Sequence, residues 1–370
     1  MTHLPGVPHM DQDVSLVTYE DGLLNILREL RKQWQEEDIV IKPLGPNLVN
    51  LALLCSCKND EEDAVVARVN GKVIKLLPCH FDRDYEFTVI RLLQQRSLGA
   101  SVVMTFRNGF CMEYIQGQHY DWTDCFYKDG PEQDEFMRIV AREIACYHCL
   151  TTANAAKQMG FETQPYFKKH CQTILDVIPH AVTNASHGAQ RIREVFGHDP
   201  FATLERELHH TYDILDDLDL PVTFCHCDAN PTNFIYRAED KRAILVDCEG
   251  CCFSYPAYDL ATHFFLSFVG SRPDIDKRLP SDEFIDKWLK IYFEERRKLG
   301  DDITDIEAEV KKWMIHISRM MLGIYWWQAA LGIYWIQQKD FFEEKVLDMF
   351  LTCATTRMKK YYEIKESISS

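Results

Sequence analysis

One stretch of the sequence, from Phe224 to Asp247, combines the residue types that phosphoryl transfer requires. It begins FCHCDANPTN and closes on the apolar run AILV followed by Asp247. The transition state of phosphoryl transfer spreads negative charge over oxygen atoms, so a divalent metal must lie near the β- and γ-phosphates. Asn233 and Asp247 offer the oxygen ligands that Mg²⁺ prefers. Asp228 can accept a hydrogen bond from a substrate hydroxyl and orient it for in-line attack.

The elements expected around this stretch would position the three side chains. Pro221 to Cys225 is typical of a strand that leads into the loop, and two further strands, Phe234 to Tyr236 and Ala243 to Val246, predict a hairpin with the loop Arg237 to Lys241. Asp and Asn are also ordinary turn residues, and the pattern HxDxxxxN by itself is weak. The strand–turn–strand context that ends in an Asp favours the functional interpretation.

The rest of the chain divides into a β-rich first part and a mainly helical second part, and the change comes after Gly117. In the first part, Asn70-Gly71 and Asn108-Gly109 lie between apolar runs and predict hairpins. Helical spacing of apolar residues predicts helices over 20–35, 84–95, 132–150, 201–215, 284–298 and 305–335. We therefore expect an α+β fold: a tail over residues 1–18, a lobe of sheet and helix over 19–117, and a helical lobe with the catalytic hairpin over 118–370.

Composition and charge exclude several classes of protein. The 370 residues are 46% hydrophobic, enough for a large core, and the formal net charge of −16 disfavours binding to nucleic acid. The N-terminus lacks the order of a secretory signal, so the 14 cysteines are expected to be reduced thiols in the cytoplasm. The apolar run Met320 to Ile336 is slightly short for a membrane span and contains Gln328, which predicts a buried helix instead.

Taken together, the motifs resemble those of the choline/ethanolamine kinase family, which belongs with the aminoglycoside-phosphotransferase and protein-kinase-like folds. The resemblance covers nearly the whole chain after about Tyr19 and rests on FCHCDANPTNFIY, LVDCEGCCFSYPAYDLATHF, FDRDYEF, NGFCMEYIQG, VAREIACYH and RLPSDEFIDKWLKIYFEE. It implies a bilobal kinase-like fold and phosphorylation of the hydroxyl of choline or ethanolamine by ATP with Mg²⁺, a first step of phospholipid synthesis. It also implies a cytoplasmic enzyme that forms a homodimer, as kinases of this family often do.

The resemblance further implies roles for individual residues. Asp228 would be the catalytic residue, with Asn233 and Asp247 as metal ligands. The implied ATP-binding residues are Asn47 and Asn50 in the phosphate-covering loop, Arg68 at the phosphates, Glu86 as its helix partner, and Glu113 and Ile115 in the hinge. The implied residues on the side of the acceptor are Asn230, Glu249, Tyr325, Trp326 and Trp327.

Three alternatives stay open at this point. Asn47 and Val49 replace the Gly and the Thr or Ser of the family's phosphate loop, which is compatible with a decayed kinase fold that only binds ligands. A zinc site is a second alternative, although free buried cysteines are the plainer interpretation; its ligands would come from Cys225, His226, Cys227, Cys248, Cys251 and Cys252. Finally, the acceptor stays open between two amines. The hinge run NGFCMEYIQG favours ethanolamine, whereas the aromatic residues Tyr325, Trp326 and Trp327 slightly favour choline, because aromatic faces attract a quaternary ammonium.

Overall fold

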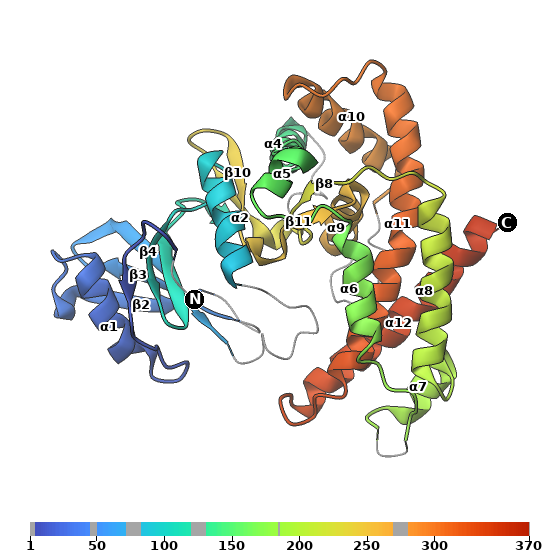
Figure 1. The fold of residues 1–370 in the computed structure, drawn as a ribbon, viewed down its shortest axis with the longest axis horizontal. Coiled ribbons are helices and arrows are strands. Elements are labelled where there is room, and N and C mark those ends of the chain that lie inside the picture. Colours follow the sequence, from blue (N-terminus) through green and yellow to red (C-terminus); the bar gives the residue numbers. More distant parts are fainter. Residues whose placement is uncertain are drawn as a thin grey trace. The chain divides into compact units, whose positions relative to one another are not determined.

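The structure of the protein is a computed structural model that describes residues 4–44, 50–71, 83–119, 131–183, 186–268 and 280–369. The chain forms two compact units. Unit 1 comprises Met1–Gln118 and the short segment Ile244–Glu249, and unit 2 comprises His119–Ala243 and Gly250–Ser370. Figure 1 colours both by position in the sequence. Asp247 therefore belongs to the unit that contains the large sheet, whereas the sequence placed it with the helical part of the chain.

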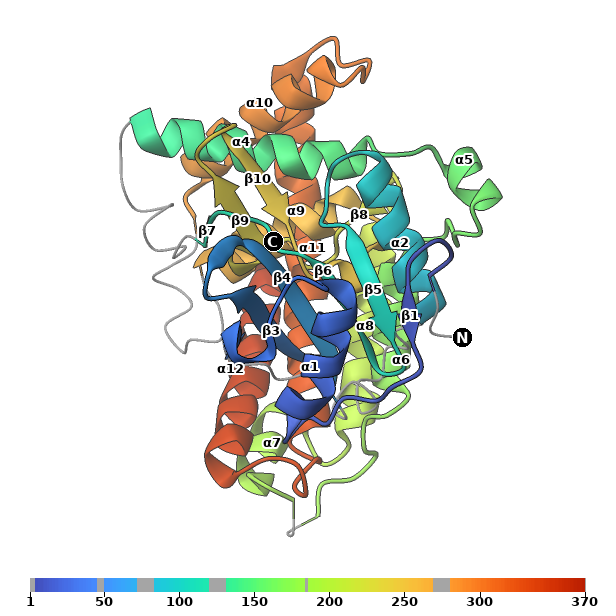
Figure 2. The same ribbon diagram turned by 90° about the vertical axis from the view of Figure 1, so that its left-hand side faces the viewer.

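Unit 1 is built on a six-stranded sheet with the order β1-β5-β6-β4-β3-β2 (Figure 2). Its strands are β1 (His9–Met10), β2 (Ile39–Pro43), β3 (Asn50–Cys57), β4 (Asp60–Asn70), β5 (Val102–Phe106) and β6 (Gly109–Glu113). β1 pairs in parallel with β5, so part of the expected N-terminal tail adds a strand to the sheet. The predicted hairpin at Asn108-Gly109 is confirmed by the antiparallel pair β5–β6. The run 72–77, expected to pair after Asn70-Gly71, lies outside the described residues.

Two helices cover opposite faces of this sheet, because neighbouring residues of a strand point to opposite sides. Cys111 of β6 belongs to the core beneath α1 (Tyr19–Leu30), together with Leu23 and Leu27 of that helix. The next residue back, Phe110, packs instead with Phe87 and Ile90 of α2 (Arg83–Gln95). On β4, Val65, Ala67 and Val69 therefore lie in the apolar core with α1, whereas Arg68 points toward α2.

Gly109 is required by the close approach of β6 to β4. A Cβ atom at this position would lie 2.1 Å from the backbone oxygen of Arg68 and 2.4 Å from the ring of Phe106. We expect Gly109→Ala to lower the free energy of unfolding by about 1–3 kcal/mol, because the strand that carries Arg68 must shift. Urea denaturation would measure the loss. Gly99→Ala is the matched control, since its Cβ would meet Leu93 at an ordinary 3.5 Å; equal midpoints for both variants would contradict the prediction.

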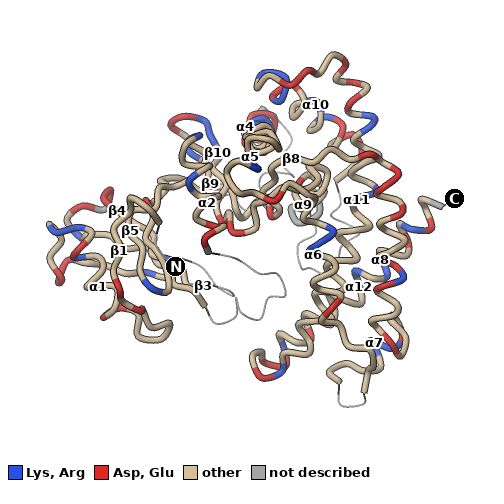
Figure 3. The backbone as a smooth tube through the Cα atoms, in the orientation of Figure 1, with Lys and Arg blue, Asp and Glu red and all other residues tan. Residues whose placement is uncertain are grey.

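Unit 2 is a helical assembly around one long helix. Its helices are α4 (Pro131–His148), α5 (Ala153–Gln158), α6 (Tyr166–Leu175), α7 (Ala189–Phe196), α8 (Pro200–Asp216), α9 (Pro256–Phe268), α10 (Asp282–Lys298), α11 (Ile306–Trp335) and α12 (Glu344–Ser369). α11 packs against α8, α9, α10 and α12. Figure 3 shows that charged residues occupy α10 but are absent from the second half of α11. Because that half is enclosed by its neighbours, the expectation of a buried helix over Met320 to Ile336 is confirmed. No helix among the described residues has the length and apolar character needed to cross a membrane.

Short elements frame the predicted catalytic stretch. β8 (Thr223–Cys225) pairs antiparallel with β11 (Cys252–Ser254), and the chain between them forms a 3-10 turn, Pro231–Asn233, followed by β9 (Phe234–Arg237) and β10 (Arg242–Leu245). A second 3-10 turn, Cys248–Gly250, leads from β10 into β11, and the two-residue β7 (Gln118–His119) lies at the border of the units. The predicted strand–loop–strand order is thus confirmed, and Asp228 and Asn233 lie in the loop before β9.

Candidate active site

The loop after β8 brings three of the predicted residues together in unit 2. Nδ2 of Asn230 donates to Oδ1 of Asp228 at 2.9 Å. Nδ2 of Asn233 donates to Oδ2 of Asp228 at 3.0 Å and to the Asp228 backbone oxygen at 2.9 Å. Each carboxylate oxygen of Asp228 therefore accepts a side-chain amide hydrogen, which holds the half-buried carboxylate in one orientation. Since the nitrogen of Asn233 faces Asp228, its amide oxygen points the other way and can serve as a metal ligand.

The backbone just before Asp228 is held by a carboxylate that the sequence did not single out. Asp259 of α9 is completely buried, and its oxygens accept the backbone N–H of His226 at 2.7 Å and that of Cys227 at 2.6 Å. Cys227 has a left-handed backbone, with φ of 64°. Such a conformation is costly for a side chain other than glycine and persists only where its surroundings impose it. The two hydrogen bonds to Asp259 supply that constraint and fix the direction in which the chain enters Asp228.

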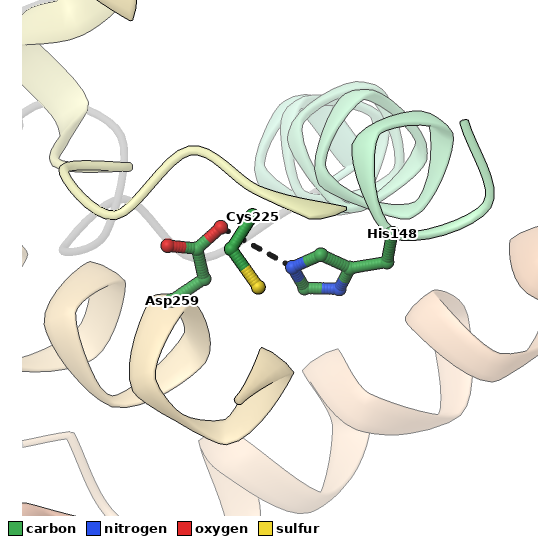
Figure 4. Close-up of side chains that lie close together, drawn as sticks. All are labelled: His148, Cys225 and Asp259. Carbon is green, nitrogen blue, oxygen red and sulfur yellow. Dashed lines mark hydrogen bonds and ion pairs between the residues drawn. The ribbon is translucent and has the colours of Figure 1, made fainter. Parts of the chain in front are cut away.

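His148, the last residue of α4, completes this buried network (Figure 4). Its Nε2 lies 3.2 Å from Oδ2 of Asp259, and its Nδ1 lies 2.6 Å from the hydroxyl of Tyr292. Burial lowers the pKa of His148, although Asp259 opposes the shift. The ring is therefore neutral, and because a carboxylate only accepts, Nε2 carries the proton while Nδ1 accepts from Tyr292. A neutral, fully bonded imidazole is a support for Asp259 and not a proton donor for chemistry.

On the other side of the loop, His263 of α9 also supports the catalytic run. Its Nδ1 donates to the backbone oxygen of Ala229 at 2.9 Å, and both residues are buried. Burial lowers the pKa of His263 to about 4, so this ring is neutral as well. α9 thus holds the chain on both sides of Asp228, through Asp259 before it and His263 after it.

A second cluster of predicted residues lies in unit 1, around the guanidinium of Arg68 on β4. Nη1 of Arg68 lies 2.8 Å from Oε1 of Glu86 on α2 and 3.9 Å from Oδ1 of Asp247. Its Nη2 forms an ion pair with Oε2 of Glu249, which also accepts from Nδ2 of Asn50 at 3.2 Å. The guanidinium carbon of Arg68, Cζ, lies over the ring of Phe110, 5.6 Å from its centre. The structure therefore brings together Asn50, Arg68, Glu86, Asp247 and Glu249, although the resemblance assigned Glu249 to the side of the acceptor.

Burial and neighbouring charges shift the pKa values of this cluster in opposite directions. Burial alone lowers the pKa of Arg68, but Glu86, Glu249 and Asp247 outweigh it and raise the pKa above its ordinary value. Burial raises the pKa of Glu249, and the charge of Asp247 adds to this effect while Arg68 opposes it. Asp247 is half exposed and has a left-handed backbone, with φ of 65°. A permanent cation next to an accessible carboxylate is an arrangement suited to a phosphate and its metal ion.

The remaining predicted residues fall in three groups. Asn47 lies outside the described residues. Glu113 is the last residue of β6, where its backbone N–H donates to the backbone oxygen of Ser101 at 2.9 Å, and Ile115 follows it in the non-regular segment before β7.

Tyr325 and Trp326 are completely buried in α11, and Nε1 of Trp326 donates to the backbone oxygen of Leu204 at 2.8 Å. Trp327 is half-buried, and its ring centre lies 5.1 Å from that of His170. Tyr325 and Trp326 are thus placed as core residues of unit 2.

The described residues offer the zinc alternative little support. The group of metal-ligating side chains found there is His148, Cys225 and Asp259, whose ligand atoms lie within 4.8 Å of one another (Figure 4). Only Cys225 belongs to the predicted zinc set. A metal ion here would have to displace the bonds of His148 and Asp259 described above, and Sγ of Cys225 is already 3.5 Å from the backbone oxygen of Ser254. The group is a buried hydrogen-bonding network that holds the loop.

The sequence did not predict Asp259 and His148 as residues of the site, although both lie within motifs of the family resemblance. Both lie in apolar helical segments, PAYDLATHF and IACYH. A buried charge needs a partner, so a single Asp among apolar residues of a helix is a signal that it satisfies polar groups in the interior. That signal identifies a buried acceptor but does not say which backbone groups it holds.

Comparisons with known proteins find related sequences and similar folds. A sequence model described as "Choline/ethanolamine kinase" matches residues 41–362. Ethanolamine kinase 1 of Mus musculus is 28% identical, over 99% of this chain and 96% of its own. Among solved structures, an ethanolamine kinase of Plasmodium vivax superposes with a TM-score of 0.73 at 14% identity, covering 97% of this chain and 92% of its own. An ADP-bound aminoglycoside phosphotransferase gives 0.55 at 14% identity, covering 91% and 99%. The expected protein-kinase-like fold is confirmed.

Proposed function

Because the chain belongs to the choline/ethanolamine kinase family, we propose that it transfers the γ-phosphoryl group of ATP to the hydroxyl of a small amino alcohol. The observation that carries the proposal is the fixed orientation of the Asp228 carboxylate. Its carboxylate is held by the amides of Asn230 and Asn233, and its backbone is held by Asp259 through the two preceding residues. A catalytic carboxylate must be oriented before the substrate arrives, since misplacement by one ångström can cost about 100-fold in rate.

Asp228 orients the acceptor in this proposal. The carboxylate accepts the hydrogen of the substrate hydroxyl, directs its oxygen toward the γ-phosphorus, and takes the proton as the new P–O bond forms. Asn230 and Asn233 keep the carboxylate from rotating away. Because phosphoryl transfer needs little covalent help from the protein, positioning of this kind supplies much of the rate.

The cluster around Arg68 binds the nucleotide phosphates. Arg68 presents a permanent positive charge, and Glu86 holds its guanidinium from α2. Asp247 with its half-exposed carboxylate and Asn233 with its outward amide oxygen are each proposed as a Mg²⁺ ligand, because each offers the hard oxygen donor that this ion prefers. When bound, the ion neutralises charge that develops on the phosphate oxygens.

Among amino alcohols, we propose ethanolamine as the preferred acceptor. A primary ammonium donates three hydrogen bonds and suits a carboxylate, whereas the quaternary ammonium of choline needs an aromatic cage. The bonds that Glu249 accepts from Arg68 and Asn50 both use Oε2, so Oε1 is the atom proposed to accept from the substrate ammonium. Two of the three predicted cage aromatics, Tyr325 and Trp326, are buried in the core. The relatives named ethanolamine kinase point the same way.

Purified protein should therefore phosphorylate ethanolamine with kcat/KM at least about tenfold above that for choline, because a site that pairs with N–H donors rejects an analogue without them. A coupled assay with ATP, Mg²⁺ and each amine would measure both values. A higher kcat/KM for choline would contradict the preference but leave the kinase activity standing. Binding of Mg-ATP without turnover of either amine would instead favour the decayed kinase fold. Magnesium dependence, a homodimer and a cytoplasmic location stay predictions.

A further inference from the structure

Two cysteine side chains meet directly beside the catalytic aspartate. Sγ of Cys227 lies 3.4 Å from Sγ of Cys252, and both residues belong to unit 2. Cys227 immediately precedes Asp228, and Cys252 is the first residue of β11. The sulfur atoms of a disulfide are about 2.05 Å apart. The two thiols are therefore in contact and need an approach of little more than one ångström to form a bond.

The backbone on both sides of this pair is held in place, so the contact does not depend on a loose loop. Cys252 pairs with Cys225 in the antiparallel ladder of β11 and β8. Two residues after Cys225, the backbone N–H of Cys227 is bound to Asp259 at 2.6 Å. The strand pairing and the buried carboxylate together aim both sulfur atoms at the same point. A third thiol, that of Cys225, is directed instead to the backbone oxygens of Thr223 and Ser254, each at 3.5 Å.

We propose that Cys227 and Cys252 form an intramolecular disulfide when the protein meets a peroxide, and that this bond lowers the rate of phosphoryl transfer. Cys227 is the partly exposed member of the pair, whereas Cys252 is buried. The thiolate of Cys227 attacks one oxygen of hydrogen peroxide, which yields a sulfenic acid and one water once protons are exchanged. The thiol of Cys252 then attacks the sulfenic sulfur, its proton goes to the leaving hydroxide, and a second water leaves. Two thiols and one peroxide give one disulfide and two waters.

Both members of the pair are thiols and not thiolates at neutral pH. The hydrogen bond with Cys252 lowers the pKa of the Cys227 thiol, but burial and the charge of Asp259 outweigh it, and the net shift is upward. Burial raises the pKa of Cys252 well above its ordinary value. Because the thiolate is the reactive form, the pair stays reduced in the absence of oxidant and responds to a sustained dose.

The new bond would act on Asp228 through the backbone. Drawing the sulfur atoms from 3.4 Å to a disulfide distance pulls the left-handed Cys227 toward β11 and strains its hydrogen bond to Asp259. Asp228 is the next residue, and its carboxylate is aligned by bonds to Asn230 and Asn233 that a shift of the chain would break. A displacement of about one ångström at a catalytic group costs up to about 100-fold in rate. We expect the oxidised protein to lose between about 10- and 100-fold in kcat.

The test treats the full-length protein with hydrogen peroxide and maps its peptides without reduction. The expected result is a peptide pair joined through Cys227 and Cys252, two hydrogens lighter than the reduced pair, together with a loss of kcat that dithiothreitol restores. Cys252→Ala should keep its activity under the same dose. Cys353→Ala removes a partly exposed thiol of α12 and is the matched control, which should stay as sensitive as the wild type.

Two results would overturn the proposal. One is the absence of the joined peptides at a dose that oxidises other partly exposed cysteines, such as Cys353, in the wild-type chain. The other is an equal, reversible loss of activity in Cys252→Ala. The mapping needs no variant and no turnover, so it tests the disulfide even if the chain has no kinase activity; failure of the proposed function would show instead as inactivity of the untreated protein.

Discussion

An Asp228→Ala variant is expected to lose phosphoryl transfer by about 10²- to 10⁴-fold in kcat while it still binds Mg-ATP. The loss follows because the acceptor hydroxyl no longer meets a carboxylate that can orient it and take its proton. Nucleotide binding is expected to persist, since the cluster around Arg68 does not include Asp228 and the proposed metal ligands Asn233 and Asp247 both remain in the variant. Steady-state kinetics with ethanolamine and calorimetric titration with Mg-ATP would measure the two properties separately.

The matched control for this variant is Asp302→Ala, which removes an exposed carboxylate of the same unit. It should retain the kcat of the wild type. Near-normal turnover of Asp228→Ala would overturn the assignment of the catalytic residue. A variant that lost ATP binding together with turnover would show that the loop is needed for the nucleotide site as well, contrary to the separation argued above.

Replacing Arg68 should have the second large effect, and it should appear in stability as well as in activity. Arg68→Leu removes the guanidinium that lies 2.8 Å from the buried carboxylate of Glu86, and it removes one of the two partners of Glu249, the other being Asn50. Breaking a buried ion pair from one side typically costs about 3–5 kcal/mol, because a charge remains in the interior unpaired. We expect a loss of this size in the free energy of unfolding, measured by urea denaturation, and a large rise in KM for ATP.

Two further variants separate charge from geometry at this position. Arg68→Lys keeps the positive charge and should recover part of the stability, but a lysine lacks the fork that contacts Glu86 and Glu249 from different nitrogens, so KM for ATP should stay high. Arg107→Leu is the control, because this arginine of unit 1 pairs with Asp11 and Asp13 at the exposed surface. If Arg68→Leu were as stable as Arg107→Leu, the buried cluster would not have the energetic role described here.

Much of the local structure followed from sequence pattern. The helices over 84–95, 201–215, 284–298 and 305–335 were expected within one or two residues of α2, α8, α10 and α11. Their apolar residues repeat with the helical period, and this signal needs no knowledge of distant contacts. The hairpin at Asn108-Gly109 was predictable for a similar reason, because its turn residues lie between two apolar runs. The first helix ended earlier than expected, at Leu30, because Arg31 leaves the helical backbone, with φ of −128°.

The sequence likewise predicted the loop that carries Asp228, but it did not predict the residues that hold this loop in place. Asp228, Asn230 and Asn233 lie within six consecutive positions, so one loop suffices to bring them together. Asp259 holds that loop from 33 residues further along the chain, and no spacing rule links it to the backbone of His226. The position of Asp247 in unit 1 was also missed, because the hairpin was expected to stay with the helical lobe.

The sequence by itself determined the elements that carry Asp228, Asn233 and Asp247 and predicted a role for each residue, because short spacings and periodic patterns are local properties of the chain. Only the tertiary structure decided that Arg68 joins Glu86 to Glu249, that Trp326 is a core residue, and that the sulfur of Cys227 meets that of Cys252. The physical reason is that buried charges, rings and thiols take their partners from whatever segments packing brings beside them, and those partners lie far away in the sequence.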